Sequence, residues 1–134
     1  KTVIQVGFEG FVDNHLHRDF AAAARSNSTV VCLATPGNKV IYVSPSFLEH
    51  TGYCAEETVG RNLAFLQGPE SEPAAIQDFR YLIANGEPGK VTITNYRKDG
   101  TPFVHEVEMR PIRDTAGALT HFIAIQRLAA NSRF

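Results

Sequence analysis

The fold is decided by residues 91–126, which read VTITNYRKDGTPFVHEVEMRPIRDTAGALTHFIAIQ. Apolar and polar side chains alternate along three runs of this stretch. Two turn sequences separate the runs, first Lys98-Asp99-Gly100 and then Asp114 to Gly117. Alternation with a period of two residues is typical of a strand with one buried face, and Asp-Gly is a frequent hairpin turn. The stretch therefore predicts three consecutive antiparallel strands.

One polar side chain interrupts the predicted inward row of each strand, namely Asn95, His105 and Gln126. A buried polar group without a hydrogen-bond partner costs about 1–3 kcal/mol, so each of these side chains needs a partner. The pattern leaves two interpretations open. The three groups contact one shared polar ligand, or they form a network that closes on itself and on the backbone.

The residues before this stretch complete the fold. Thr29 to Ala34 and Lys39 to Ser44 flank the turn Thr35-Pro36-Gly37-Asn38 and predict a hairpin. Short helical turns are expected from Pro45 to Phe65. A longer helix is expected from Ser71 or Glu72 to Asn85-Gly86. This order predicts an α+β protein with one five-stranded antiparallel sheet, its helices on one face, and room for a ligand between the two layers.

An amphipathic helix is also expected near the N-terminus. Val12, Leu16, Phe20 and Ala24 recur every four residues, and the pattern ends near Arg25. The predicted organisation is therefore a helical extension over residues 1–28, one α+β domain over residues 29–127, and a tail over residues 128–134.

The composition of the chain excludes several classes of function. The 134 residues carry a formal net charge of −1, which argues against direct binding to nucleic acid. No apolar stretch is long enough to span a bilayer, and no secretory signal is visible. The two cysteines, Cys32 and Cys54, match neither a disulfide framework nor a metal motif, which suggests a reducing cytoplasm. His15 and His17 point apart on a helix, so we expect no metal site.

Catalytic residues are not expected either, because the sequence contains no nucleophile–base pair, no phosphate-binding glycine loop and no metal cluster. We therefore expect a protein that is not an enzyme.

Three segments of the chain resemble the flavin-binding signature of LOV (light-oxygen-voltage) domains, a branch of the PAS family. They are GRNLAFLQGP at residues 60–69, NYRKDG at residues 95–100, and FIAIQ at residues 122–126. The resemblance runs without a gap from about Tyr42 to Gln126. It implies a PAS fold, FMN bound non-covalently in the dark, and a cysteine of the first segment that attacks flavin C4a under blue light.

The resemblance also assigns roles to individual residues. It places Asn62 and Gln67 against the ribityl hydroxyls and Arg80 against the phosphate. Asn95 is expected to hydrogen-bond the polar edge of the isoalloxazine ring. Gln126 occupies the position that senses protonation of flavin N5 by turning over its amide.

The sequence departs from the family pattern at four other positions. Leu63 stands where the photoreactive cysteine is expected, so the usual adduct cannot form there. Ala64 replaces a second phosphate-binding arginine, which weakens the preference for FMN over riboflavin or FAD. His105 replaces a second ring-edge asparagine and can still offer one donor and one acceptor. Ala124 replaces a glycine beside the ring.

Two functions from different classes follow from this pattern. The first is a flavin sensor without the usual adduct, in which light or a redox change reduces the flavin and switches the hydrogen bond of Gln126. Its partners would be a second copy of the chain or an effector domain of a longer chain. The alternative is a flavin-free PAS module that dimerises or binds another small ligand.

The two thiols receive separate interpretations. Cys32 lies in the first predicted strand, where a free cysteine is usually a small hydrophobic side chain. If it faces inward, it is an alternative thiol for adduct formation. Cys54 is expected to fill a position at the surface.

Overall fold

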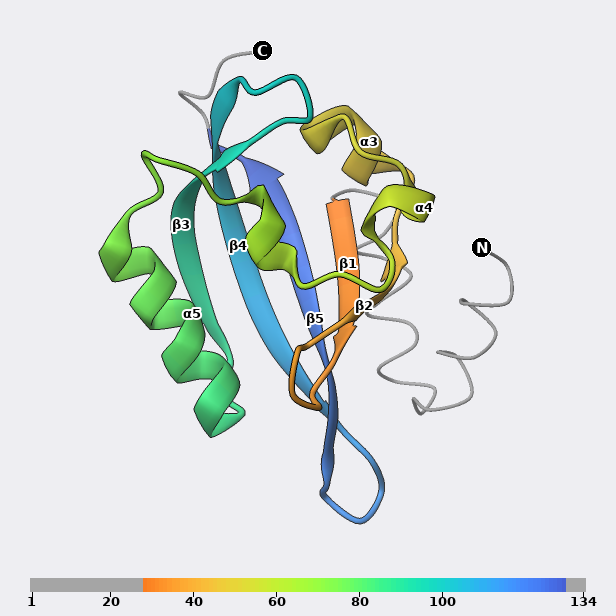
Figure 1. Ribbon diagram of the computed structural model, residues 1–134. Coiled ribbons are helices and arrows are strands. Elements are labelled where there is room, and N and C mark those ends of the chain that lie inside the picture. Colours follow the sequence, from red (N-terminus) through yellow and green to blue (C-terminus); the bar gives the residue numbers. More distant parts are fainter. Residues whose placement is uncertain (1–27, 130–134) are drawn as a thin grey trace.

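Five segments of the chain form the strands of a single sheet in the computed structural model, which describes residues 28–129 (Figure 1). The strands are β1 (Ser28–Leu33), β2 (Val40–Val43), β3 (Gly89–Tyr96), β4 (Pro102–Arg113) and β5 (Leu119–Leu128). Their order is β2-β1-β5-β4-β3, and every neighbouring pair is antiparallel. The predicted five-stranded antiparallel sheet is confirmed, and the last strand lies at its centre.

Alternation along the strands divides the buried side chains between two faces. On β5, Phe122 and Ala124 pack in the larger apolar cluster, whereas Ile123 and Ile125 pack in a smaller one. Because successive side chains of a strand point to opposite faces, the two clusters lie on opposite sides of the sheet. The larger cluster also contains residues of the helices, so it is the side on which the helices pack.

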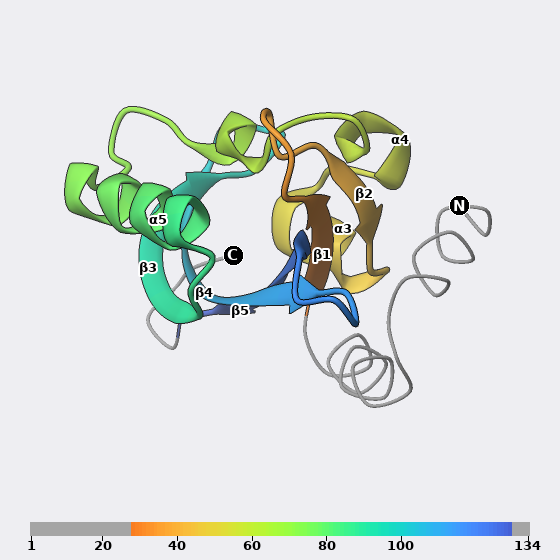
Figure 2. The ribbon, with the colours of Figure 1, turned by 90° about the horizontal axis from the view of Figure 1, so that it is seen from below.

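The helical layer covers that inner face. Its members are α3 (Ser46–Thr51), α4 (Ala55–Thr58), the 3-10 helix η1 (Leu63–Leu66) and α5 (Pro73–Asn85). Figure 2 shows the sheet curving beneath this layer, with α5 beside β3 and with α3 and α4 beside β1 and β2. The expected PAS arrangement of helices on one face is therefore confirmed.

The ends of α5 follow its sequence closely. Pro73 occupies the first turn, where a proline loses no hydrogen bond. Gly86 ends the helix with φ of 61°, a left-handed conformation that a residue without a side chain adopts readily. The predicted limits at Glu72 and at Asn85-Gly86 are confirmed.

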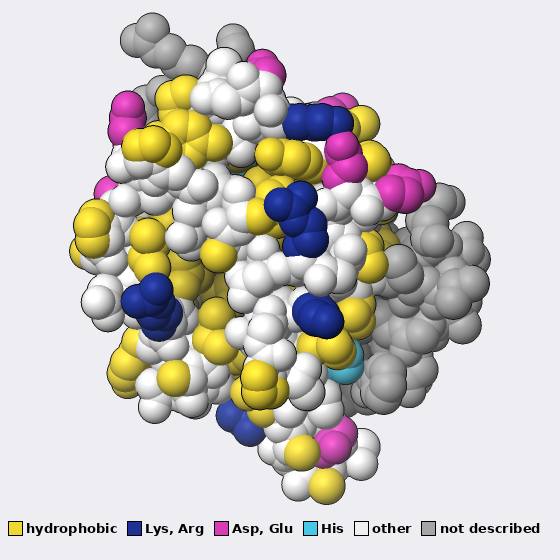
Figure 3. Space-filling model, viewed as in Figure 1, with side chains coloured by type: hydrophobic (Ala, Val, Ile, Leu, Met, Phe, Trp, Pro, Cys, Tyr) yellow, Lys and Arg dark blue, Asp and Glu magenta, His cyan; other side chains and the backbone are white. Residues whose placement is uncertain are grey.

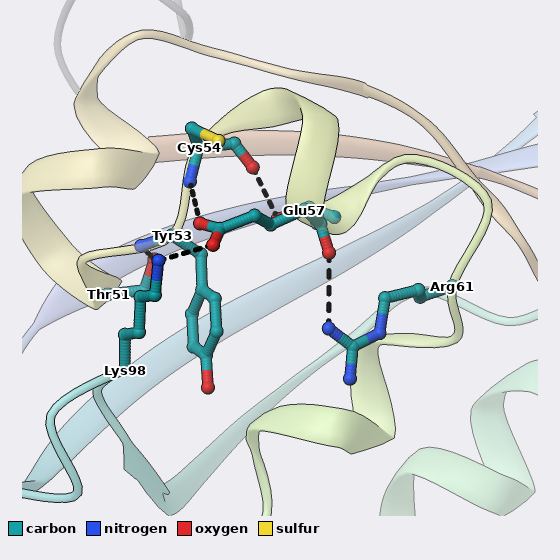
Figure 4. Close-up of polar contacts among 7 residues, drawn as sticks. Thr51, Tyr53, Cys54, Glu57, Arg61 and Lys98 are labelled. Carbon is teal, nitrogen blue, oxygen red and sulfur yellow. Dashed lines mark hydrogen bonds and ion pairs between the residues drawn. The ribbon is translucent and has the colours of Figure 1, made fainter.

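Glu57 joins three segments next to the first signature motif (Figure 4). Its carboxylate accepts a hydrogen bond from the Cys54 backbone N–H at 3.1 Å and pairs with Lys98 of the β3–β4 turn. Its backbone carbonyl accepts a hydrogen bond from Arg61 Nη1 at 3.1 Å. Cys54 is half-buried in the N-cap position of α4, so the expectation that it only fills the surface was wrong.

Some of the predictions lie outside the described residues. The helix from Val12 to Arg25 falls there, as do His15 and His17. The proposed domain limits at residues 28 and 127 stay predictions. Among residues 28–129, no helix is long and apolar enough to cross a membrane.

Candidate ligand-binding site

A cavity of about 400 Å³ lies between the sheet and the helical layer. This volume falls within the range of small-molecule sites, about 300–1,000 Å³. Figure 3 shows hydrophobic side chains in the recess beside α5. Six of the seven residues predicted for the site line this cavity: Asn62, Leu63, Gln67, Arg80, Asn95 and Gln126. The space expected between the two layers is therefore present.

The sheet supplies a mostly apolar wall with two amides in it. Seven of its residues line the cavity: Cys32, Ile93, Asn95, Val107, Met109, Ala124 and Gln126. They come from β1, β3, β4 and β5, and alternation along each strand points them to the same face. An apolar wall with a few placed polar groups is typical of a site for a flat organic ligand.

Asn95 presents one end of its amide to the sheet and leaves the other without a partner. Its Nδ2 donates to Nδ1 of His105 at 3.2 Å. Within residues 28–129, its Oδ1 has no hydrogen-bond partner. Because Asn95 is 6% exposed and lines the cavity, that oxygen is a ready acceptor for a ligand N–H.

In Gln126 the amide oxygen has a partner and the amide nitrogen has none among the described residues, the reverse of Asn95. Its Oε1 accepts a hydrogen bond from Ser28 Oγ at 3.0 Å, and its Nε2 has no partner in the described part of the chain. The side chain is 1% exposed and lines the cavity. The two amides therefore offer one acceptor and one donor from two different strands. The sequence did not reveal the role of Ser28, since a serine at a strand end has no distinguishing pattern.

His105 is fully buried but is not among the cavity-lining residues, so it lies behind Asn95. Its Nε2 lies 3.3 Å from Nδ1 of His50 on α3. Burial, with smaller contributions from His50 and Arg97, lowers the pKa of His105 from 6.5 to about 3. The imidazole is therefore neutral near neutral pH. No sequence pattern pointed to His50, which stands in a short helical turn.

The helical wall carries the groups predicted to hold the ligand's tail. Asn62 caps η1, because its Oδ1 accepts from the Ala64 N–H at 2.8 Å and its Nδ2 donates to the Gly37 carbonyl at 3.0 Å. Arg80 is exposed on α5 and lines the same cavity as Ala64. The contacts predicted for Asn62, Gln67 and Arg80 with a ribityl phosphate stay predictions.

Two positions bear on covalent chemistry at the cavity. Leu63 lines it and offers no nucleophile. Cys32 also lines it, and burial raises the pKa of this thiol to about 12. Cys32 Sγ lies 3.9 Å from the Phe122 carbonyl, as a weak hydrogen bond. A neutral thiol is therefore present in the cavity wall, on the sheet side opposite Leu63.

A cavity of small-molecule size between a five-stranded antiparallel sheet and a layer of helices places the chain among the α+β domains with an internal ligand site. Residues 27–127 match the PAS domain family, and the chain belongs to that family, within its LOV branch. The dark structure of the Aureochrome1 LOV domain superimposes with a TM-score of 0.79 at 34% identity, covering 89% of this chain and 86% of that one. The LOV domain of the *Erythrobacter litoralis* EL346 blue-light activated histidine kinase superimposes with a TM-score of 0.73 at 34% identity, covering 77% of this chain and 95% of that one.

Longer proteins contain similar segments. Phototropin-1A of *Oryza sativa* subsp. japonica is 42% identical over 107 residues, which make up 79% of this chain and 12% of that protein. A blue-light-activated histidine kinase of *Brucella canis* is 37% identical over 91 residues, or 68% of this chain and 19% of that protein. The chain therefore spans less than a fifth of the length of these relatives.

Proposed function

We propose that this chain is a sensory domain that binds a flavin and responds to blue light without a thiol at position 63. The observation that carries the proposal is the pair of cavity amides. Asn95 Oδ1 and Gln126 Nε2 lack partners among residues 28–129 and come from β3 and β5. A flavin fits this donor set, because it combines a flat apolar ring with an edge of alternating N–H, carbonyl and ring-nitrogen groups.

The walls of the cavity fit the other parts of such a ligand. Ile93, Val107 and Met109 supply apolar contacts to a ring face. Arg80 supplies one cation beside the cavity, whereas position 64 is an alanine. Because Arg80 can still pair with a phosphate, FMN is the first candidate ligand. Because one arginine favours a phosphate less than two do, riboflavin and FAD are close competitors.

A bound flavin supplies absorption of blue light and the capacity to accept electrons. The response of the chain is assigned to Gln126. In the resting arrangement Oε1 accepts from Ser28 Oγ at 3.0 Å, and Nε2 would donate to the ligand. If the facing ligand atom took up a proton, the amide would turn over, so that Oε1 would accept from the ligand and Nε2 would donate to the Ser28 hydroxyl. The change then reaches Ser28, the first residue of β1.

No thiol is needed for this response. Position 63 is a leucine, and Cys32 is held as a neutral thiol against the Phe122 carbonyl. An effector domain of a longer chain, or a second copy, is the proposed partner. The name of one relative supports an effector, since it is a blue-light-activated histidine kinase.

The flavin-free alternative has less support from the described surface. In residues 28–129 the large exposed apolar side chains are Leu48 on α3 and Tyr81 on α5. These two helices lie on opposite sides of the view in Figure 1, so the pair does not form one docking face. A cavity of about 400 Å³ lined by unpartnered amides also favours a ligand over a filled core.

The test is to titrate the purified protein separately with riboflavin, FMN and FAD and to measure binding by the quenching of flavin fluorescence. We expect saturable binding, and about tenfold weaker binding for Asn95→Ala, because one buried hydrogen bond is lost. Asn85→Ala is the matched control, since Asn85 is exposed at the end of α5 and its side chain donates to the Tyr81 carbonyl. Absence of saturable binding for all three flavins would refute the proposal.

A further inference from the structure

A chain of hydrogen bonds runs from the cavity to the outer helical layer. Asn95 in the cavity wall contacts Nδ1 of His105 at 3.2 Å, and Nε2 of His105 contacts Nδ1 of His50 at 3.3 Å. His105 is fully buried on β4, whereas His50 is partly exposed on α3. The middle group therefore has no contact with solvent, and the outer group does.

The donor and acceptor roles along this chain follow from one another. The Asn95 Nδ2 group can only donate, so Nδ1 of His105 accepts and carries no proton. The neutral ring of His105 then carries its proton on Nε2 and donates to Nδ1 of His50. As a result, Asn95 is held with its carbonyl oxygen toward the cavity, ready for a ligand N–H.

We propose that His50 and His105 form a relay that sets which end of the Asn95 amide faces the cavity, and thereby couples ligand recognition to protonation of His50. The inference rests on the proposed function, in which the polar edge of the ligand lies against Asn95. His50 and His105 are positioning residues, since neither is among the residues that line the cavity.

Protonation of His50 reverses each bond of the relay. A charged His50 carries protons on both nitrogens, so its Nδ1 donates to Nε2 of His105 instead of accepting from it. The single proton of the neutral His105 then moves from Nε2 to Nδ1, and the Asn95 amide turns so that Oδ1 accepts from it. Nδ2 now faces the cavity. One proton is taken up from solvent in all, and His105 stays neutral throughout.

The charged and titratable groups around His50 set the pH of this change. Burial lowers the pKa of His50 from 6.5, Glu49 on the same helix raises it, and Arg97 at the end of β3 lowers it. Arg97 lies over the Phe103 ring at 4.6 Å, and that ring packs edge-on against His105 at 4.6 Å. The relay therefore reverses at a pH below the usual histidine value of 6.5.

The first test needs no ligand. Nitrogen-15 chemical shifts of the histidine rings in the flavin-free protein report which nitrogen carries the proton. We expect the proton of His105 on Nε2 near neutral pH and on Nδ1 once His50 is protonated. In His50→Phe, the ring proton of His105 should stay on the same nitrogen over the same pH range. A proton of His105 that stays on one nitrogen while His50 titrates would overturn the relay.

The second test measures riboflavin affinity as a function of pH. Because Asn95 presents the wrong end below the pKa of His50, we expect affinity to fall about tenfold across that titration. His50→Phe should keep the affinity seen at higher pH and lose the pH step. His121→Gln, which changes a histidine of β5 that does not line the cavity, should keep the step. A step that survives in His50→Phe would refute the coupling.

The two tests separate failure of the relay from failure of the proposed function. If no flavin binds, the chemical shifts still decide whether the relay exists. If flavin binds but neither the histidine shifts nor the affinity change with pH as described, the relay is refuted and flavin binding stands.

Discussion

Replacing His105 with asparagine should remove most of the acid sensitivity of folding that this buried imidazole creates. His105 is fully buried, contacts Asn95 and His50, and has its pKa lowered to about 3, mainly by burial. In an unfolded chain the same ring titrates at its usual value of about 6.5. Between those two values the unfolded state binds a proton that the folded state excludes.

The sign and size of the effect follow from linkage. Above the unfolded value His105 is neutral in both states and adds no pH dependence. As pH falls toward the folded value, the unfolded state gains protons, so the free energy of unfolding decreases. With a folded-state pKa of about 3, His105 accounts for a loss of about 2 kcal/mol between about pH 7 and about pH 5.

Urea unfolding at these two pH values measures the effect. The difference between the two free energies of unfolding should be about 2 kcal/mol smaller in His105→Asn than in the parent, whatever the variant's stability at neutral pH. Asn85→Ala, an exposed change on α5, should leave the difference unaltered. Equal pH differences in the parent and in His105→Asn would refute the claim that His105 is held neutral.

Three further predictions test other parts of the structure. Glu57→Gln should lower stability at neutral pH, because Lys98 and the Cys54 N–H hold the pKa of Glu57 down at about 2. The loss in free energy of unfolding should become smaller as pH falls from about 4.5 through that value. A loss that stays constant when urea unfolding is measured over this pH range would contradict this. Gly68→Ala should cost about 1–3 kcal/mol in urea unfolding, since its Cβ would lie 2.3 Å from Tyr96 Cε1, and a neutral result would contradict the packing. Gln126→Leu should leave flavin bound but abolish the light-induced infrared change of a glutamine amide; an unchanged amide signal would exclude Gln126 as the responding group.

Most of the fold was predictable because its signals are local. Alternation in residues 91–126 and the turn at Lys98-Asp99-Gly100 determined the three long strands, and Pro73 and Gly86 marked the ends of α5. The pairing of β1 with β5 was not predictable from local pattern. It depends on contacts between residues such as Ser28 and Gln126, which lie 98 positions apart.

The candidate site was predictable only in part, for a related reason. Inward polar residues on strands are visible as breaks in an apolar row, which located Asn95, His105 and Gln126. The sequence could not show that His105 lies behind Asn95 instead of in the cavity wall, since both positions alternate inward. His50 carried no signal at all, because its significance arises from a contact across 55 positions.

The most direct test of the proposed response compares two proteins loaded with FMN under blue light. The parent, with Leu63, should keep its flavin free of a thiol bond, whereas Leu63→Cys should lose the blue absorption band on illumination and recover it in the dark, because it places a thiol in the cavity wall. A parent that itself forms such an adduct, and stops doing so in Cys32→Ala, would contradict the account and identify Cys32 as the photoreactive thiol.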